Sequence, residues 1–177
     1  MAREKRIDMV ILGLLSHEDL SGYDMKKRID GSIRFFWKGS FGNIYPALRD
    51  MEAQGLIVKR EASVTGREKI TYSITQSGRK MLEKWLSDER SSNEIRYETL
   101  LKVFFGGQAK KEVSLHNIEV FEERIRADLA LMKSYCEQLK NALDDEDHRY
   151  YYLTASFGVE SYEAYLKWCK KAKEILG

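Results

Sequence analysis

The fold is decided by the stretch Trp37–Ile57, WKGSFGNIYPALRDMEAQGLI. Its apolar residues Ile44, Leu48 and Met51 recur at the spacing of a helix with one buried face. Gly55 follows the last of them, where a glycine favours the end of a helix. The front of the stretch is different, because it is rich in small polar residues and contains the single proline of the chain. This composition predicts that the first turns of the helix face a binding partner.

Further segments on both sides of this helix complete a recognisable order. Residues 7–16 form a short apolar run with helical spacing, and Ser21 can cap a second helix. After the central helix the apolar period changes to that of strands, and residues 56–61 and 69–75 predict a β-hairpin. Thr75 can cap a fourth helix. The predicted apolar stripe of that helix is Met81, Leu82, Trp85 and Leu86.

This order of elements, over residues 7–90, is that of a winged helix-turn-helix. In such a domain the third helix is presented to the major groove of DNA, which is wide enough to admit it. Small residues at the front of that helix allow its backbone N–H groups to approach a phosphate. Tyr45 and Arg49 lie four residues apart and share a face directed away from the core. Arg67 and Lys69 flank the predicted turn of the hairpin, where they could contact a phosphate or the minor groove.

Each of these side chains also has an interpretation without DNA. Tyr23 and Tyr45 could pack between helices, and Arg49 could form a surface ion pair. The two basic residues of the hairpin could be solvated. A winged-helix module that binds only proteins would carry an acidic or apolar surface in this place. The stretch between Asp30 and Asp50 argues against such a module, because it contains basic residues and no acid.

The second half of the chain is predicted to be helical. The polar residues 87–93 predict a boundary between a winged-helix domain, residues 1–90, and an α-helical domain, residues 91–177. Helices are expected over about 94–105, 111–143 and 147–176. The whole chain is thus expected to be mainly α with a small β-hairpin.

The long helix and the last helix carry apolar residues at coiled-coil-like spacing. Such stripes must be buried, either against each other or against a second chain. The stripe expected in the last helix is Tyr150, Thr154, Phe157, Ser161, Ala164, Trp168, Ala172 and Ile175. The residues predicted to form a dimer contact are Ile118, Phe121, Ile125, Leu129, Met132, Leu139, Phe157 and Trp168.

Size and composition are typical of a soluble folded protein. The 177 residues fit one large domain or two small ones, with 43% hydrophobic and 33% charged residues. No apolar run approaches the ~20 residues of a membrane span. The apolar patch near the N-terminus contains Asp8 and lacks a cleavage site, so a secretory signal is not expected. Cys136 and Cys169 lie in apolar helical patterns and are predicted to be reduced core thiols in the cytoplasm.

The sequence offers no support for an enzyme, a cofactor site or a metal site. No phosphate-binding loop, Rossmann glycine pattern, nucleophile elbow or pair of catalytic carboxylates occurs. His17, His116 and His148 share no zinc-ligand spacing. The acidic run Asp144–Asp147 lacks the glycine and the distal glutamate of a calcium loop, so it is expected to begin a helix.

Three blocks of the sequence resemble the PadR family of bacterial transcriptional regulators. They are SGYDMKKRI, FWKGSFGNIYPALRDMEAQGLI and GREKITYSITQSGRKML. They match the family's Gly-Tyr start of the second helix, its S-x-G-x-(I/L)-Y-P-x-L recognition helix and its wing. The blocks span roughly half of the chain and stay in register. The helical second half looks closest to the branch with a C-terminal domain of the virulence-activator type.

The resemblance implies a homodimer, held together by its C-terminal helices, that binds a pseudo-palindromic operator. Most members repress transcription, many are relieved by a small aromatic or planar compound, and some activate. No motif here identifies an effector, and the three tryptophans could either line an effector pocket or belong to the core. The residues predicted to bind DNA are Tyr23, Lys38, Ser40, Gly42, Asn43, Tyr45, Pro46, Arg49, Arg67 and Lys69.

Overall fold

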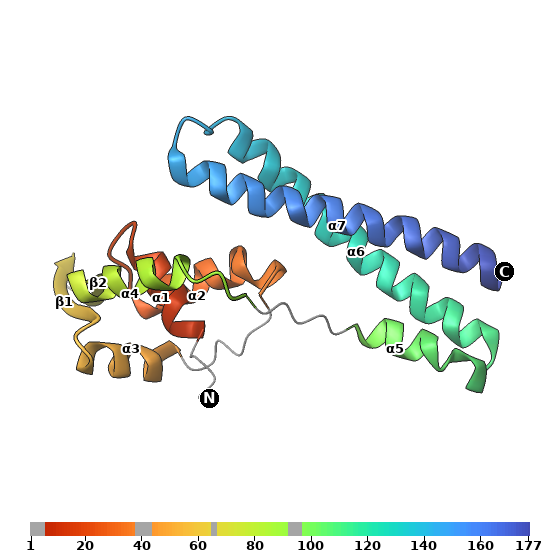
Figure 1. Ribbon diagram of the computed structural model, residues 1–177, viewed down its shortest axis with the longest axis horizontal. Helices are drawn as coiled ribbons and strands as arrows, with labels where there is room; N and C mark the ends of the chain where they lie inside the picture. The colour runs from red at the N-terminus through yellow and green to blue at the C-terminus, as the bar shows by residue number, and fades with distance from the viewer. Residues whose placement is uncertain (1–5, 38–43, 65–66, 92–96) are drawn as a thin grey trace. The chain divides into compact units, whose positions relative to one another are not determined.

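The computed structural model describes residues 6–37, 44–64, 67–91 and 97–177, without the side chains of Arg6 and of residues 61–69. The chain divides into two compact units, Met1–Ser92 and Asn93–Gly177, which we call the N-terminal unit and the C-terminal unit (Figure 1). No helix in the described ranges is long and apolar enough to cross a membrane.

The N-terminal unit has the predicted order of three helices, a hairpin and a fourth helix. Its elements are α1 (Arg6–Leu15), α2 (Gly22–Gly31), the short 3-10 helix η1 (Ile33–Phe35), α3 (Ile44–Ala53), β1 (Ile57–Val64), β2 (Arg67–Ile74) and α4 (Gln76–Leu86). One apolar core joins them. Its fully buried side chains come from α1, α2, α3 and β1 and are Ile11, Leu12, Leu15, Met25, Ile29, Leu48, Met51 and Ile57.

The helix ends are fixed by the local chemistry that the sequence predicts. Ser21 and Asp24 form a reciprocal capping box at the start of α2, with the Asp24 N–H donating to Ser21 Oγ at 3.2 Å. Thr75 caps α4, where its hydroxyl oxygen accepts from the Gly78 N–H at 3.1 Å. Gly55 follows α3 with a φ of 68°, a conformation that glycine adopts without strain.

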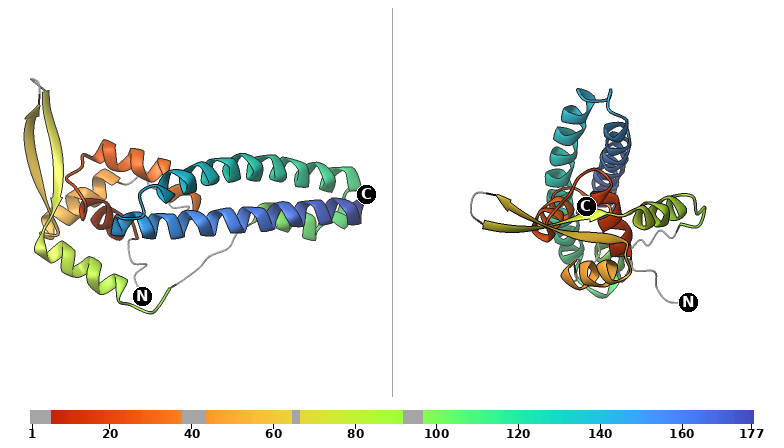
Figure 2. Two further views of the ribbon diagram at one scale, coloured as in Figure 1. Left: turned by 90° about the horizontal axis from the view of Figure 1, so that it is seen from above. Right: turned by 90° about the vertical axis from the view of Figure 1, so that its left-hand side faces the viewer.

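The two strands form an antiparallel ribbon that extends beyond the helices of the N-terminal unit (Figure 2). Ile57 is opposite Ile74 in the register, and Val64 is opposite Arg67. One contact was not predicted. Leu20, before α2, forms a bridge with Tyr72, with N···O distances of 3.2 and 2.9 Å. This bridge ties the base of the hairpin to the start of α2.

The predicted apolar stripe of α4 is wrong in part. Only Leu82 of that stripe packs against the core, whereas Met81, Trp85 and Leu86 are exposed. The reason is that α4 meets the rest of the unit at its beginning. A Cβ built at Gly78 would lie 2.2 Å from the carbonyl oxygen of Leu56, so only a glycine allows α4 to approach Leu56 this closely. The later turns of α4 extend away from this contact.

The C-terminal unit is a long helical hairpin with a short helix beside it. Its elements are α5 (Glu98–Phe104), the 3-10 helix η3 (Gly106–Gln108), α6 (Lys111–Lys140) and α7 (Glu146–Leu176). α6 and α7 lie side by side and antiparallel along their length (Figure 1). The acidic run begins α7 as expected, because the Asp145 carboxylate accepts from the N–H groups of Asp147 and His148 at 2.9 and 3.2 Å.

The apolar stripe of α6 is buried within the single chain. The buried residues are Ile118, Phe121, Ile125, Leu129, Met132 and Cys136, and Leu139 is half-buried. Ile118, Phe121 and Ile125 form one apolar cluster with α7 residues that include Tyr162, Leu166 and Cys169. All of these α6 residues except Cys136 were predicted to form a dimer contact, and the single chain already buries or half-buries each of them. Both cysteines are buried free thiols.

The stripe predicted for α7 lies mostly on the solvent side of the hairpin. Tyr150, Phe157 and Ile175 are 62%, 69% and 72% exposed, and Trp168 is half-buried against Phe121. Of the two alternatives left open for this stripe, the structure disfavours burial against α6, and burial against a second chain stays a prediction. The stripe forms an apolar surface that the single chain leaves uncovered.

One buried charge fixes α6 against α7. Glu122 is 8% exposed and accepts hydrogen bonds from Lys173 of α7 and from Arg126, the latter at 2.6 Å. The Lys173 contact, which outweighs the effect of burial, and the Arg126 contact lower the pKa of Glu122. A buried carboxylate of this kind needs its partners, because an unpaired charge in the core is strongly unfavourable.

An aromatic cluster holds the start of α5 against the helices α6 and α7. Tyr97, immediately before α5, shares a hydrogen bond between hydroxyl groups with Tyr165. Burial, and then this hydrogen bond, raise the pKa of Tyr97 to about 12. Trp168 and Leu100 join Tyr97, Phe121 and Tyr165 around a small apolar cavity of about 110 Å³.

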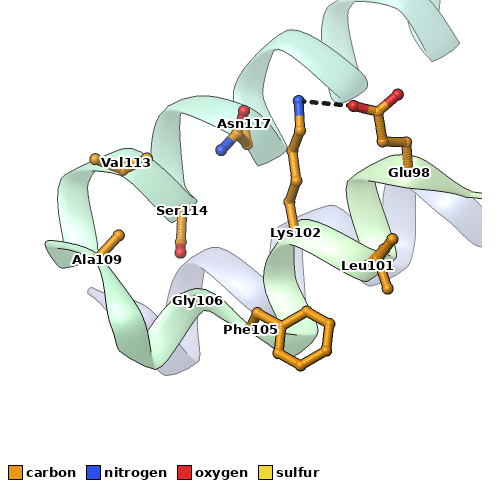
Figure 3. Close-up of a pocket in the computed structure, with 9 residues that line it drawn as sticks. All are labelled: Glu98, Leu101, Lys102, Phe105, Gly106, Ala109, Val113, Ser114 and Asn117. Atoms are coloured by element: carbon orange, nitrogen blue, oxygen red, sulfur yellow. Dashed lines mark ion pairs between the residues drawn. The ribbon is translucent and has the colours of Figure 1, made fainter.

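A larger groove opens on the other side of α5. It has a volume of about 500 Å³ and lies between α5 and the first turns of α6 (Figure 3). Leu101, Phe105 and Val113 form its apolar walls, and each of them is at least half exposed. Glu98 and Lys102 form an ion pair at its edge with an N···O distance of 3.2 Å. The groove is therefore an open, mainly apolar surface.

Candidate nucleic-acid interface

α3 separates core residues from candidate reading residues on opposite faces. Ile44, Ala47, Leu48 and Met51 are buried and fix the helix on the core. Tyr45, Pro46 and Arg49 lie on the other face and are exposed, Tyr45 by 59%. This division follows from the helical period, since residues four apart share a face. Tyr45 is therefore not a buried core residue, although its ring contacts α2.

Tyr23 lies on the exposed side of α2. Its side chain is 70% exposed, while its neighbours Gly22 and Met25 are buried. The Tyr45 ring reaches from α3 to the first turn of α2, because a Cβ built at Gly22 would lie 2.8 Å from Tyr45 Cε1. The two tyrosines thus stand at the beginnings of neighbouring helices, each with a hydroxyl group that can donate a hydrogen bond.

Pro46 is the third residue of α3 as the structure describes it. The first N–H groups of a helix have no acceptor inside the helix, so a proline here removes no hydrogen bond. The pyrrolidine ring of Pro46 is a rigid, apolar group on the exposed face. Pro46 is therefore compatible with close contact to a flat or curved partner surface.

The charges near this face are mainly basic. Arg49 is exposed, and no described acid forms an ion pair with it. Lys26 and Lys27 of α2 are exposed, and Arg28 is paired with Glu18. The one acid at the start of α2, Asp24, is already occupied by Ser21, whose Oγ donates to it at 2.7 Å. The face therefore presents exposed cations and tyrosine hydroxyl groups, which suit an anionic partner.

The remaining predicted residues cannot be located by their side chains. Lys38, Ser40, Gly42 and Asn43 lie outside the described residues. Arg67 and Lys69 belong to β2, opposite Val64 and Ala62 in the hairpin register. Their position on the hairpin agrees with the predicted wing.

Gly22 was not predicted as part of this surface. The Gly-Tyr pair was recognised only as the start of the second helix. The sequence carries no local signal of this role, because the role depends on how closely α2 and α3 approach each other. Among the described residues no group of three or more His, Cys, Asp or Glu side chains could hold a metal ion.

Comparison with known proteins agrees with this geometry. Residues 11–84 match the model of the transcriptional regulator PadR-like family, and residues 95–177 match that of the virulence activator alpha C-terminal domain. The negative transcriptional regulator PadR of Bacillus subtilis is 35% identical over 97 residues, which are 54% of this chain and 53% of that protein. The chain thus matches about half the length of this curated relative.

Solved structures extend the similarity to nearly the whole chain. The crystal structure of Bacillus subtilis PadR in complex with operator DNA has a TM-score of 0.86 at 25% identity, covering 98% of this chain and 100% of that one. The Vibrio cholerae virulence activator AphA has a TM-score of 0.71 at 27% identity, covering 93% and 94%. With its core, its hairpin and both matched regions, this chain belongs to the PadR-like family of transcriptional regulators.

Proposed function

We propose that this protein is a homodimeric, sequence-specific DNA-binding transcriptional regulator that acts in the cytoplasm. The observation that carries the proposal is the exposed face of α3 and α2. Tyr23, Tyr45 and Arg49 project from it, while the opposite face of α3 is locked into the core. The similar PadR of Bacillus subtilis was crystallised with operator DNA, which supports DNA as the partner of this chain.

In this proposal α3 enters the major groove of one half-site. Tyr45 and Arg49 contact the backbone or the base edges, with Tyr23 beside them on α2. The predicted residues Lys38, Ser40, Gly42 and Asn43 belong to the approach of α3 to the duplex. Arg67 and Lys69 on the hairpin contact a neighbouring phosphate or the minor groove. The two α3 helices of a dimer would lie about one helical turn of DNA apart, ~34–36 Å.

We propose that residues 91–177 form the dimerisation domain, with residues 1–90 as the DNA-binding domain. Because the α6 stripe is buried within the chain, we propose that the contact between chains uses other apolar side chains. α5 and the residue that follows it supply a dense group of them, since Leu100, Leu101, Phe104 and Phe105 are 44–80% exposed. Phe157 adds a member of the originally predicted set. Apolar clusters of this kind mark interaction surfaces in soluble proteins.

The similar proteins support both repression and activation of transcription. The matched Bacillus subtilis relative is described as a negative regulator, which favours repression. The C-terminal region matches a virulence activator domain, and AphA shares the fold of the whole chain, which favours activation. We propose repression as the main function, because the curated relative that is 35% identical over 97 residues is a negative regulator. A small aromatic effector stays a prediction from the family resemblance.

The experiment is a binding titration of the full-length protein with a duplex from upstream of its own gene. A scrambled duplex of equal length is the control. We expect preferential binding to the upstream duplex, and affinity that falls steeply between 50 and 200 mM salt because phosphate contacts release counterions. Equal, salt-insensitive binding to both duplexes, or no binding, would contradict the proposal and favour a winged-helix module that binds only proteins.

A further inference from the structure

We infer that Gly22 is a positioning residue for Tyr45, holding the tyrosine ring where its hydroxyl can meet DNA. Gly22 is buried at the first position of α2. A Cβ built on it would lie 2.8 Å from Cε1 and 3.3 Å from Cζ of Tyr45, and 3.4 Å from Cδ1 of Leu48. The ring of Tyr45 therefore occupies the space that any other residue would fill. The inference rests on the proposed function of the α2–α3 face.

The backbone gives no other reason for a glycine at this position. The only glycine with a positive φ among the described residues is Gly55. Gly22 is the first residue of a regular helix and has no positive φ, so its backbone conformation is open to alanine. The space above Gly22, and not its backbone conformation, is what distinguishes it from alanine.

A side chain at position 22 would displace Tyr45 rather than the core. Leu48 is fully buried and is held on all sides, whereas Tyr45 is 59% exposed. The easier response to a methyl group is thus a rotation of the Tyr45 ring away from α2. Cζ carries the hydroxyl, so this rotation moves the hydroxyl as well. We therefore expect a methyl group at position 22 to leave the fold intact and to move the hydroxyl group of Tyr45.

A displaced hydroxyl matters because hydrogen bonds to DNA have narrow geometry. Donor and acceptor must lie within about 2.5–3.0 Å for a hydroxyl donor, and the bond weakens steeply with misalignment. α2 and α3 are both anchored in the core by Met25, Ile29 and Met51. The Tyr45 ring, resting on Gly22, therefore shares the rigidity of the two helices before DNA arrives, which lowers the entropy lost on binding.

The test is a double-mutant cycle in the full-length protein, made of wild type, Gly22→Ala, Tyr45→Ala and the double variant. The probe is the duplex from upstream of its own gene. We expect Gly22→Ala to weaken binding by roughly five- to fiftyfold, in the range of a lost DNA contact. In the Tyr45→Ala background the same substitution should change the affinity little, because no ring is left to displace. Thermal unfolding should show no loss of stability for Gly22→Ala.

Gly31→Ala is the matched control, since a Cβ at Gly31 in the same helix meets nothing within 4 Å. It should leave the affinity unchanged. A Gly22→Ala protein that binds like wild type, or that loses as much affinity in the Tyr45→Ala background, overturns the inference. An NMR contact between the Gly22 Hα and the Tyr45 ring tests the geometry without DNA, and its absence in wild type also overturns it. Failure of wild type to bind the duplex would overturn the proposed function itself.

Discussion

The hydroxyl group of Thr75 links the start of α4 to the turn between α3 and β1. Its Oγ1 accepts from the Gly78 N–H, and it lies 2.7 and 3.0 Å from the carbonyl oxygens of Gly55 and Leu56, to which it can donate. The residue thus fastens the start of α4 to the turn between α3 and β1. This turn sets the angle between the helix that carries Tyr45 and the hairpin.

We expect Thr75→Ala to lower the free energy of unfolding by about 1–2 kcal/mol, since it removes a helix cap and leaves carbonyl groups without this donor. Urea denaturation followed by circular dichroism measures the change. Thr154→Ala on the exposed side of α7 is the control, because Thr154 only donates to the Tyr150 carbonyl oxygen one turn earlier. Its expected effect is within about 0.5 kcal/mol. Equal losses for the two variants would contradict the role of Thr75.

At the scale of elements, local chemistry in the sequence was sufficient to predict the order and the ends of most helices and strands. Caps at Ser21 and Thr75, the glycine at position 55 and the acidic start of α7 act within one turn, so the sequence displays them directly. The faces of α4 and α7 depend on which neighbour each helix meets. Periodicity reports that a stripe exists, but a stripe such as that of Phe157 is equally suited to the same chain or a second one.

The contact of Tyr45 with Gly22 belongs to the same class of missed features. It joins residues that are far apart in sequence and depends on the distance between α2 and α3. The sequence indicated which face of α3 is exposed, because that follows from the positions of Ile44, Leu48 and Met51. It could not indicate that the ring of Tyr45 turns toward α2.

The Glu122 contact predicts how the stability of the C-terminal hairpin depends on pH. Lys173, and then Arg126, hold the pKa of Glu122 below its ordinary value of 4.5. The ionised, paired form therefore stabilises the hairpin above pH 4.5, and this stabilisation is lost as the pH falls through the lower, folded-state pKa. We expect Glu122→Gln to lower the melting temperature at pH 7 and to converge with wild type in acid.

Thermal unfolding between pH 7 and pH 3 measures this dependence. Glu123→Gln, a change at an exposed neighbour on α6, provides the control and should follow the wild-type curve. Parallel curves for Glu122→Gln and wild type over the whole pH range would mean that the paired carboxylate does not stabilise the hairpin.

At the scale of the whole molecule, the exposed apolar face of α5 predicts where two chains meet. Phe104 is 80% exposed, the most of the large apolar side chains in the described residues. We expect Phe104→Lys to raise the dimer dissociation constant by at least about tenfold, because a charged side chain would have to be buried at the contact. Sedimentation should then show the 20.7 kDa chain where wild type sediments at twice that mass.

Leu86→Lys is the matched control for that experiment. Leu86 is also strongly exposed, at 68%, but it lies on α4 of the N-terminal unit. The variant should remain dimeric. A Phe104→Lys protein that stays dimeric while folded would remove α5 from the proposed contact and leave the exposed stripe of α7 with Phe157.

The central claim is that the exposed face of α2 and α3 reads DNA, and the affinity of the Tyr45→Ala/Arg49→Ala double variant tests it most directly. Titration against the duplex from upstream of its own gene, with circular dichroism and sedimentation on the same samples, gives the answer. The predicted result is a folded dimer in which each substitution costs about 1–3 kcal/mol of binding free energy. A double variant that binds this duplex as tightly as wild type would contradict the claim.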